Sequence, residues 1–165
     1  MLIELPILWI IILDFIAWFF FHMLISWLCL KIPDHWLHNN QTFFKSRSFE
    51  RNGDLWQSLF HIKSWKKFLP DGSFILKANY DKKELGQTNV ENLEKFLIEI
   101  NRAELTHWLS MLPALLFFIW NPLWAGFIMI AYAILANMPF ILTQRYNRPR
   151  LQRLLQLKQQ REAGK

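Results

Sequence analysis

Glu104 and His107 stand three positions apart, a spacing that makes them neighbours on the surface of a helix. They continue an apolar face formed by Leu93, Leu97 and Ile100, so both side chains are expected to point toward protein rather than water. A carboxylate beside an imidazole in a partly dry site orients a general base and keeps it basic. The pair therefore predicts proton transfer by His107. The alternative is a plain ion pair on the helix, with His107 at the lipid headgroups.

Basic and amide side chains in two further segments, 63–72 and 144–150, are suited to an anionic ligand. Guanidinium and ammonium groups both bind phosphate, and amides can donate hydrogen bonds to it. The residues expected to bind substrate are Arg102, Lys66, Lys67, Asp71, Asn137, Gln144, Arg145, Asn147 and Arg148. The competing explanation is attraction to anionic lipid, worth about 1 kcal/mol for each cation near the surface. That explanation is preferred for Lys63 and for the far end of the tail.

Asp14 and His22 lie inside the first apolar segment, where an ionised side chain is costly and normally has a polar partner. Asn137 and Tyr132, in the last apolar segment, are the partners we expect. Contacts between helices are the preferred role for these residues, ahead of catalysis.

The elements that must position these residues follow from an uneven composition. The chain has 165 residues, of which 53% are hydrophobic, yet it carries 19 Lys and Arg against 13 Asp and Glu. Apolar residues gather in segments 5–30, 105–120 and 123–143, the last two separated by the turn signal Asn121-Pro122. This pattern predicts an all-α membrane protein with three transmembrane helices, the last two forming a hairpin, in a single membrane domain.

Segment 31–104 is too short and too interrupted by turns to bury a core of its own, so we expect it to lie on the membrane surface. Asp54 marks one helix start within it, and the capping box Thr88–Glu91 marks another that continues into the second span. Pro149 is expected to open a separate helix in a basic amphipathic tail, 144–165, that lies on anionic lipid.

The distribution of charged residues and the single cysteine limit the membrane topology, the kinds of site and the partners that we expect. Lys and Arg are frequent before and after the hairpin and absent from the N-terminus, which predicts a cytoplasmic loop and C-terminus with the N-terminus outside. The single Cys29 excludes a disulfide framework and a multi-thiolate metal site. Nucleic acid is not an expected partner, because the basic tail directly follows a membrane span.

Four blocks of sequence carry a resemblance: FExNG at Phe49–Gly53, KxWKKxLPDG at Lys63–Gly72, RxELxHW at Arg102–Trp108 and WAGxxMIxYAIxxNxPxIxxQRYNRxRLxR at Trp124–Arg153. Together they resemble the glycosyl-4,4'-diaponeurosporenoate acyltransferase family. The resemblance implies a multi-pass protein of the bacterial plasma membrane. It also implies esterification of a fatty acyl chain onto the sugar of a glycosylated carotenoid, the last step toward staphyloxanthin-like pigments.

The chemistry implied is O-acyl transfer without a cofactor, from a co-substrate such as acyl-CoA or acyl carrier protein to a lipophilic glycoside. His107, oriented by Glu104, would take the proton from a sugar hydroxyl. Cations among the predicted ligands would hold the donor's phosphates, and Asn147 or Gln144 would donate to the oxyanion. The alternative function is a non-catalytic membrane scaffold or lipid-binding subunit. Three spans enclose little volume, which leaves a homo-oligomer or a cleft open to lipid as possible arrangements.

Overall fold

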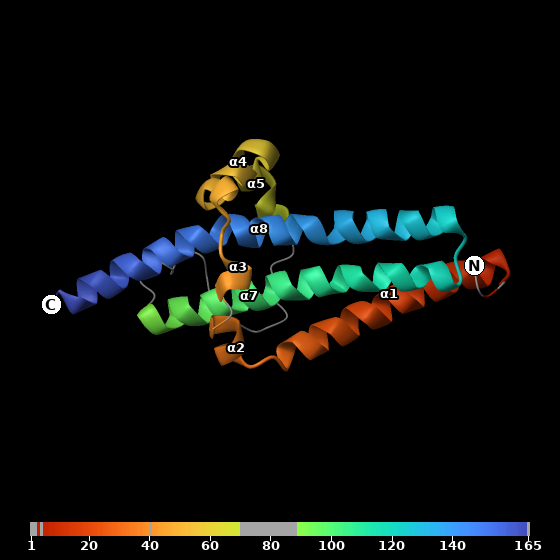
Figure 1. Ribbon diagram of the computed structural model, residues 1–165, viewed down its shortest axis with the longest axis horizontal. Helices are drawn as coiled ribbons and strands as arrows, with labels where there is room; N and C mark the ends of the chain where they lie inside the picture. The colour runs from red at the N-terminus through yellow and green to blue at the C-terminus, as the bar shows by residue number, and fades with distance from the viewer. Residues whose placement is uncertain (1–2, 4, 40, 70–88, 165) are drawn as a thin grey trace. The chain divides into compact units, whose positions relative to one another are not determined.

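The computed structural model describes residues 3, 5–39, 41–69 and 89–164, and this part of the chain is helical without a strand (Figure 1). It divides into two compact units. The first comprises Met1–Leu37 and Arg102–Ile141, and the second comprises His38–Asn101 and Leu142–Lys165. The predicted ligand Asp71 and the predicted cap Thr88 lie outside the described residues.

The first unit contains α1 (Ile7–Leu30), the end of α7 (Val90–Met111), the 3₁₀ helix η3 (Leu112–Ile119) and the beginning of α8 (Leu123–Ala163). Its core is the stacked pair Trp18 and Phe117, with ring centroids 4.6 Å apart, packed against two buried alanines, Ala114 and Ala133. The predicted middle span, 105–120, is helical, but it changes from α to 3₁₀ after Met111, next to Pro113. Proline removes a backbone N–H and so disfavours continuation of the α-helical pattern.

Among the helices of the described residues, two, α1 and α8, are long and apolar enough to cross a membrane. Within an apolar stretch of 18 residues in each helix, only 17% of the stretch is buried in α1 and only 28% in α8. A core helix of a soluble protein would bury most of such a stretch, whereas lipid can cover these side chains in a membrane. Large apolar residues of α1 that are exposed include Ile7, Phe15 and Phe19. The two helices therefore suit membrane association.

Asp14 bridges α1 to the turn before α8, as an interhelical contact. Its Oδ1 accepts hydrogen bonds from Nε1 of Trp120 and Nδ2 of Asn121, each at 2.7 Å. The prediction that Asn137 and Tyr132 are the partners of Asp14 and His22 was therefore wrong. Nδ1 of His22 contacts the carbonyl oxygen of Trp18, in its own helix, at 2.8 Å. A turn that carries its own polar side chains satisfies the carboxylate, so residues in the middle of α8 are not needed for it.

The second unit is built on the first half of α7 and the last part of α8. Leu93, Ile100 and Leu151 form its buried apolar cluster, and Leu154 and Leu155 pack against them. The apolar stripe of the tail, which we expected to face lipid, is thus covered by α7. At the start of α7, Oδ1 of Asn89 accepts from the backbone N–H of Asn92 at 2.9 Å, an N-cap one residue after the predicted one.

Pro149 does not open a new helix, because α8 runs through it as one helix from Leu123 to Ala163. A proline inside a helix costs about 3 kcal/mol through the lost hydrogen bond and a steric clash. Buried residues on both sides, Tyr146, Arg148 and Leu151, make contacts that hold the helix together across this position. Sequence position alone did not reveal those contacts.

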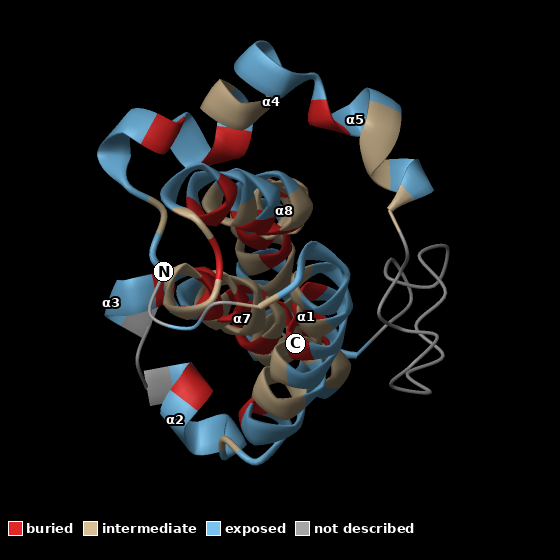
Figure 2. Ribbon diagram, turned by 90° about the vertical axis from the view of Figure 1, so that its right-hand side faces the viewer, coloured by how far each residue is buried: buried red, intermediate tan, exposed pale blue. Residues whose placement is uncertain are grey.

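The remaining helices are short: α2 (Asp34–Asn39), α3 (Gln41–Phe44), η1 (Ser48–Gly53), α4 (Asp54–Phe60), α5 (Ile62–Trp65) and η2 (Lys66–Phe68). The predicted helix start at Asp54 is confirmed. No residue of α4 is buried, as its exposed and intermediate colours show (Figure 2). Gly53, just before α4, has φ +90°, and a Cβ there would lie 3.1 Å from the Cα of Tyr146 in α8. Glycine therefore lets this loop approach α8 closely.

Candidate active site

His107 and Asn137 form the most chemically suggestive pair of the first unit. Nδ1 of His107, in α7, lies 2.9 Å from Oδ1 of Asn137, in α8. Nδ2 of Asn137 donates to the carbonyl oxygen of Ala133 at 2.9 Å, which fixes the amide so that its oxygen faces the imidazole. Because an amide oxygen can only accept, Nδ1 of His107 must carry the proton, and Nε2 of the neutral ring holds a lone pair.

The ring of His107 is further held by stacking on Phe140, with centroids 4.4 Å apart and planes 9° from parallel. Among the described residues, Nε2 of His107 has no hydrogen-bond partner. In the same part of the chain, Oγ of Ser46 is the one side-chain nitrogen or oxygen that is both fully buried and without a partner. Nε2 of His107 is therefore not fully buried, and it is accessible. An oriented imidazole with an accessible lone pair is what a general base requires.

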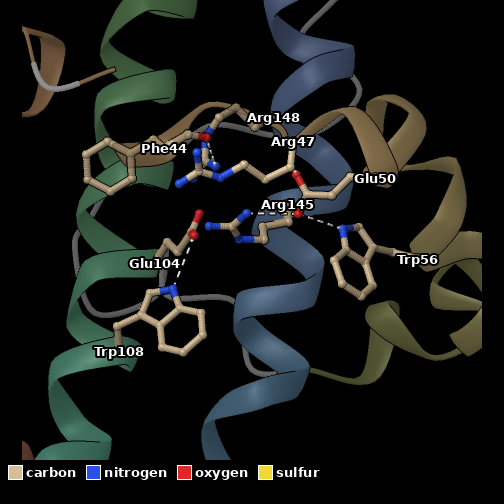
Figure 3. Close-up of polar contacts among 8 residues, drawn as sticks. All are labelled: Phe44, Arg47, Glu50, Trp56, Glu104, Trp108, Arg145 and Arg148. Carbon is tan, nitrogen blue, oxygen red and sulfur yellow. Dashed lines mark hydrogen bonds and ion pairs between the residues drawn. The ribbon is translucent and has the colours of Figure 1, made fainter. Parts of the chain in front are cut away.

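The hydrogen bond that the structure shows at Glu104 does not go to this ring. It is fully buried, and its Oε1 accepts from Nε1 of Trp108 at 3.2 Å (Figure 3). Residues three apart on a helix are neighbours, but their side chains leave the axis about 60° apart. In the described structure the hydrogen bond to His107 comes from Asn137, in a different helix, in place of the expected carboxylate.

Arg102 is also placed differently from our expectation. Its guanidinium donates to the carbonyl oxygens of Cys29 and Ile32, at 2.8 and 2.7 Å, and forms an ion pair with Asp34. The last carbonyls of a helix lack partners in the regular helical pattern, and Arg102 donates to one of them, that of Cys29, and to the carbonyl of Ile32 just beyond α1. These contacts give Arg102 a structural role rather than that of a free phosphate ligand.

Glu50 is a buried carboxylate of the second unit that the sequence reasoning missed. It is 1% exposed and accepts from Arg145 at 2.8 Å, from Nε1 of Trp56 at 3.2 Å and from the backbone N–H of Arg47 at 2.6 Å (Figure 3). Its position within the block FExNG was the available signal. The contacts join η1 and α4 to α8 and use Arg145, a predicted phosphate ligand, as an internal partner.

Lys66 and Asn147 were both predicted to bind substrate, and the structure brings them together. Nζ of Lys66 donates to Oδ1 of Asn147 at 2.9 Å and lies 4.8 Å from the centroid of the Tyr146 ring. The guanidinium of Arg150 lies 3.8 Å from the same centroid and pairs with Asp54 at 2.8 Å. Buried Tyr146 thus organises two cations around it.

The other predicted ligands of the second unit, Arg148, Lys67 and Gln144, lie in different surroundings. Arg148 is buried and donates to Oδ1 of Asn101 at 2.8 Å and to the carbonyl oxygen of Phe44 at 2.7 Å. Lys67 is exposed, with its Nζ 5.0 Å from the centroid of the neighbouring Phe68 ring. Gln144 is half-buried and makes no side-chain hydrogen bond within the described residues.

Comparison with known proteins supplies the family. The family model for glycosyl-4,4'-diaponeurosporenoate acyltransferase matches residues 40–157, which include His107, Asn137 and Glu50. The chain belongs to this family. It is therefore a member of a family of acyltransferases, and the resemblance seen in its sequence blocks is confirmed.

Curated relatives agree with that assignment. The glycosyl-4,4'-diaponeurosporenoate acyltransferase of Staphylococcus aureus strain MRSA252 is 39% identical over 144 residues, covering 87% of each chain. That of Staphylococcus haemolyticus is 39% identical over 145 residues, covering 88% of this chain and 84% of the relative. No solved structure matches the chain significantly.

Proposed function

We propose that this acyltransferase esterifies a fatty acyl chain onto a sugar hydroxyl of a lipophilic glycoside, such as a glycosylated carotenoid. The names of its relatives support this acceptor. The observation that carries the chemistry is the hydrogen bond between His107 and Asn137, which leaves Nε2 of the imidazole as an accessible base.

In the proposed mechanism, Nε2 of His107 takes the proton of the sugar hydroxyl as its oxygen attacks the acyl carbonyl carbon. The C–O bond forms, the tetrahedral intermediate collapses, and the imidazolium returns the proton to the departing thiolate of an acyl thioester. Asn137 accepts the Nδ1–H throughout, which keeps the ring in the productive tautomer. No cofactor is needed, since the co-substrate is the acyl donor itself.

We propose supporting roles in substrate binding for other residues that the sequence predicted as ligands. Asn147 uses its oxygen to accept from Lys66, which leaves its N–H groups as oxyanion donors, with Gln144 as the alternative. Lys66, Lys67, Arg145 and Arg148 are proposed for the donor's phosphates, although Arg145 and Arg148 already have internal partners.

We further propose a multi-pass location in the bacterial plasma membrane, with 105–120 as the middle of three spans and the N-terminus outside. The exposed apolar side chains of α1 and α8 support embedding. From Arg145 onward the chain carries seven Lys and Arg against one acid, Glu162, which favours a cytoplasmic C-terminus. The acceptor's polyene would then lie in the bilayer and its sugar at the inner interface.

The test is expression of the full chain in a strain that makes the glycosylated carotenoid, with mass spectrometry of the extracted pigment. An added acyl group, dependent on the protein, is the expected result. The absence of acylated product across several sugars, with the protein present in the membrane fraction, would instead favour a non-catalytic scaffold.

A further inference from the structure

A groove of about 590 Å³ lies within the second unit, a volume within the range of small-molecule sites. Its wall on α8 includes Leu155 and four polar residues, Arg148, Gln152, Gln156 and Gln159, whose spacing of four, four and three residues puts them on one helix face. The opposite wall, on α7, includes apolar side chains. The groove therefore presents amides along its length and a cation at one position of the same face.

The described residues that line the groove carry more positive than negative charge. Lys45 lines it, is exposed, and has no hydrogen-bond or ion-pair partner among the described residues. Arg148 is buried and held by Asn101, so it contributes a fixed positive charge. Among the described lining residues the one carboxylate is that of Glu94, which accepts from Nε2 of Gln159 at 3.2 Å. Within this part of the lining, the two cations Lys45 and Arg148 outnumber it, which favours an anionic ligand.

We propose that this groove binds the phosphopantetheine carrier of the acyl donor, an inference that rests on the proposed acyltransferase function. A phosphopantetheine arm has a phosphate at one end and two amides along its length. Lys45 and Arg148 match the phosphate, and the glutamines both donate to and accept from amides. Leu97 and Ile98 of the lining match the arm's methyl and methylene groups.

Other phosphate-bearing ligands match this lining less fully. A phospholipid headgroup such as that of phosphatidylglycerol offers a phosphate and hydroxyls but no amides. Inorganic phosphate would occupy the cationic part alone. Coenzyme A and acyl carrier protein both carry the phosphopantetheine arm, so the groove recognises the chemistry that the two donors share.

The first experiment measures binding to the full chain in nanodiscs by calorimetry. The probes are coenzyme A, pantetheine without phosphate, inorganic phosphate, and acyl carrier protein with and without its phosphopantetheine group. Coenzyme A and the holo carrier protein are expected to bind, and each probe that lacks half of the arm's chemistry is expected to bind about tenfold more weakly or worse. Equal binding of the holo and apo carrier proteins would overturn the proposal.

The second experiment changes the groove. Lys45→Gln and Gln156→Leu alter exposed side chains, so both variants are expected to fold. Each should weaken coenzyme A binding by about tenfold, the loss typical of a hydrogen bond to a charged or amide group. Lys63→Gln is the matched control, because Lys63 is also exposed and does not line the groove. Unchanged coenzyme A affinity in both groove variants would overturn the proposal.

Two readouts separate this inference from the proposed function. If Lys45→Gln lowers binding to phosphatidylglycerol vesicles but not to coenzyme A, the groove is a lipid site and the inference fails, while acyl transfer still stands. The inference also fails if the wild-type protein transfers acyl groups and the groove variants keep its KM for the donor. A third outcome is that the protein binds coenzyme A in a manner that depends on Lys45 but acylates no glycoside. That outcome would support the groove as a phosphopantetheine site and would contradict the proposed glycoside acceptor.

Discussion

The amide oxygen of Asn137 lies 2.9 Å from Nδ1 of His107, and the amide nitrogen of the same residue is fixed by the carbonyl oxygen of Ala133. One side chain of α8 thereby sets both the orientation and the tautomer of an imidazole on α7. The same arrangement, an imidazole held by a hydrogen bond at one nitrogen and accessible at the other, underlies general-base catalysis in unrelated acyl-transfer enzymes.

Replacing His107 with Ala should therefore lower acyl transfer by about 10²- to 10⁴-fold, the usual contribution of a general base. The measurement is acylated pigment formed per amount of protein in isolated membranes. His35→Ala serves as the control, because His35 is exposed and outside both the site and the groove. A normal rate in the His107 variant would remove it from the mechanism.

In the proposed mechanism Asn137 positions His107, so its removal should act through His107. Asn137→Leu keeps the volume but removes the acceptor for the Nδ1–H, and we expect kcat to fall by about 10- to 100-fold with little change in KM for the donor. Asn137→Asp retains an acceptor and should recover part of the lost kcat. Equal losses in the two variants would indicate that Asn137 is important only for packing.

The sequence predicted the helical class and, to within two residues, the positions at which α1 and α8 begin. Apolar runs and the Asn121-Pro122 turn are local signals, and local signals can be read without coordinates. Asn137 is 30 positions from His107, so their pairing depends on how α7 packs against α8, which no periodicity encodes. Glu104 was preferred because it is close in sequence.

The C-terminal tail, 144–165, shows that sequence patterns are also a limited guide to how an apolar face packs. Its leucines were correctly identified as one apolar face, but the pattern cannot tell whether lipid or another helix covers that face. The structure places Leu151 against Leu93 and Ile100 of α7. Likewise, Glu50 has three donors contributed by residues from 47 to 145, and only the fold reveals that they meet.

Glu50→Ala should destabilise the protein by about 3 kcal/mol, because it removes the carboxylate of a buried ion pair with Arg145 and takes the acceptor away from Nε1 of Trp56 and from the backbone N–H of Arg47. The measurement is the thermal unfolding midpoint of the purified protein in detergent. The double variant Glu50→Ala with Arg145→Ala should lose less than the sum of the two single losses. Additive losses would show that the two side chains are not coupled.

Gly53→Ala should destabilise the loop before α4 by about 1–3 kcal/mol, since φ is +90° and the new Cβ would meet the Cα and carbonyl oxygen of Tyr146 at 3.1 Å. Backbone atoms of a helix cannot move aside as a flexible side chain can. Gly164→Ala is the control, because its Cβ would meet one atom, at 3.4 Å, near the end of α8. An equal unfolding midpoint for the two variants would contradict the close approach of the loop to α8.

Pro149→Ala distinguishes the continuous α8 of the structure from the separate tail helix expected from the sequence. Within a continuous helix, alanine restores a hydrogen bond to the carbonyl of Arg145 and relieves the proline clash, so stability should rise by about 1–3 kcal/mol. At the first position of a new helix, proline costs nothing and the same change would leave stability unaltered or slightly lower. Pro6→Ala provides the comparison, because Pro6 immediately precedes α1 rather than lying within it. A raised unfolding midpoint for Pro149→Ala alone would establish that one helix carries Asn137, the cation ligands and the groove face of this enzyme.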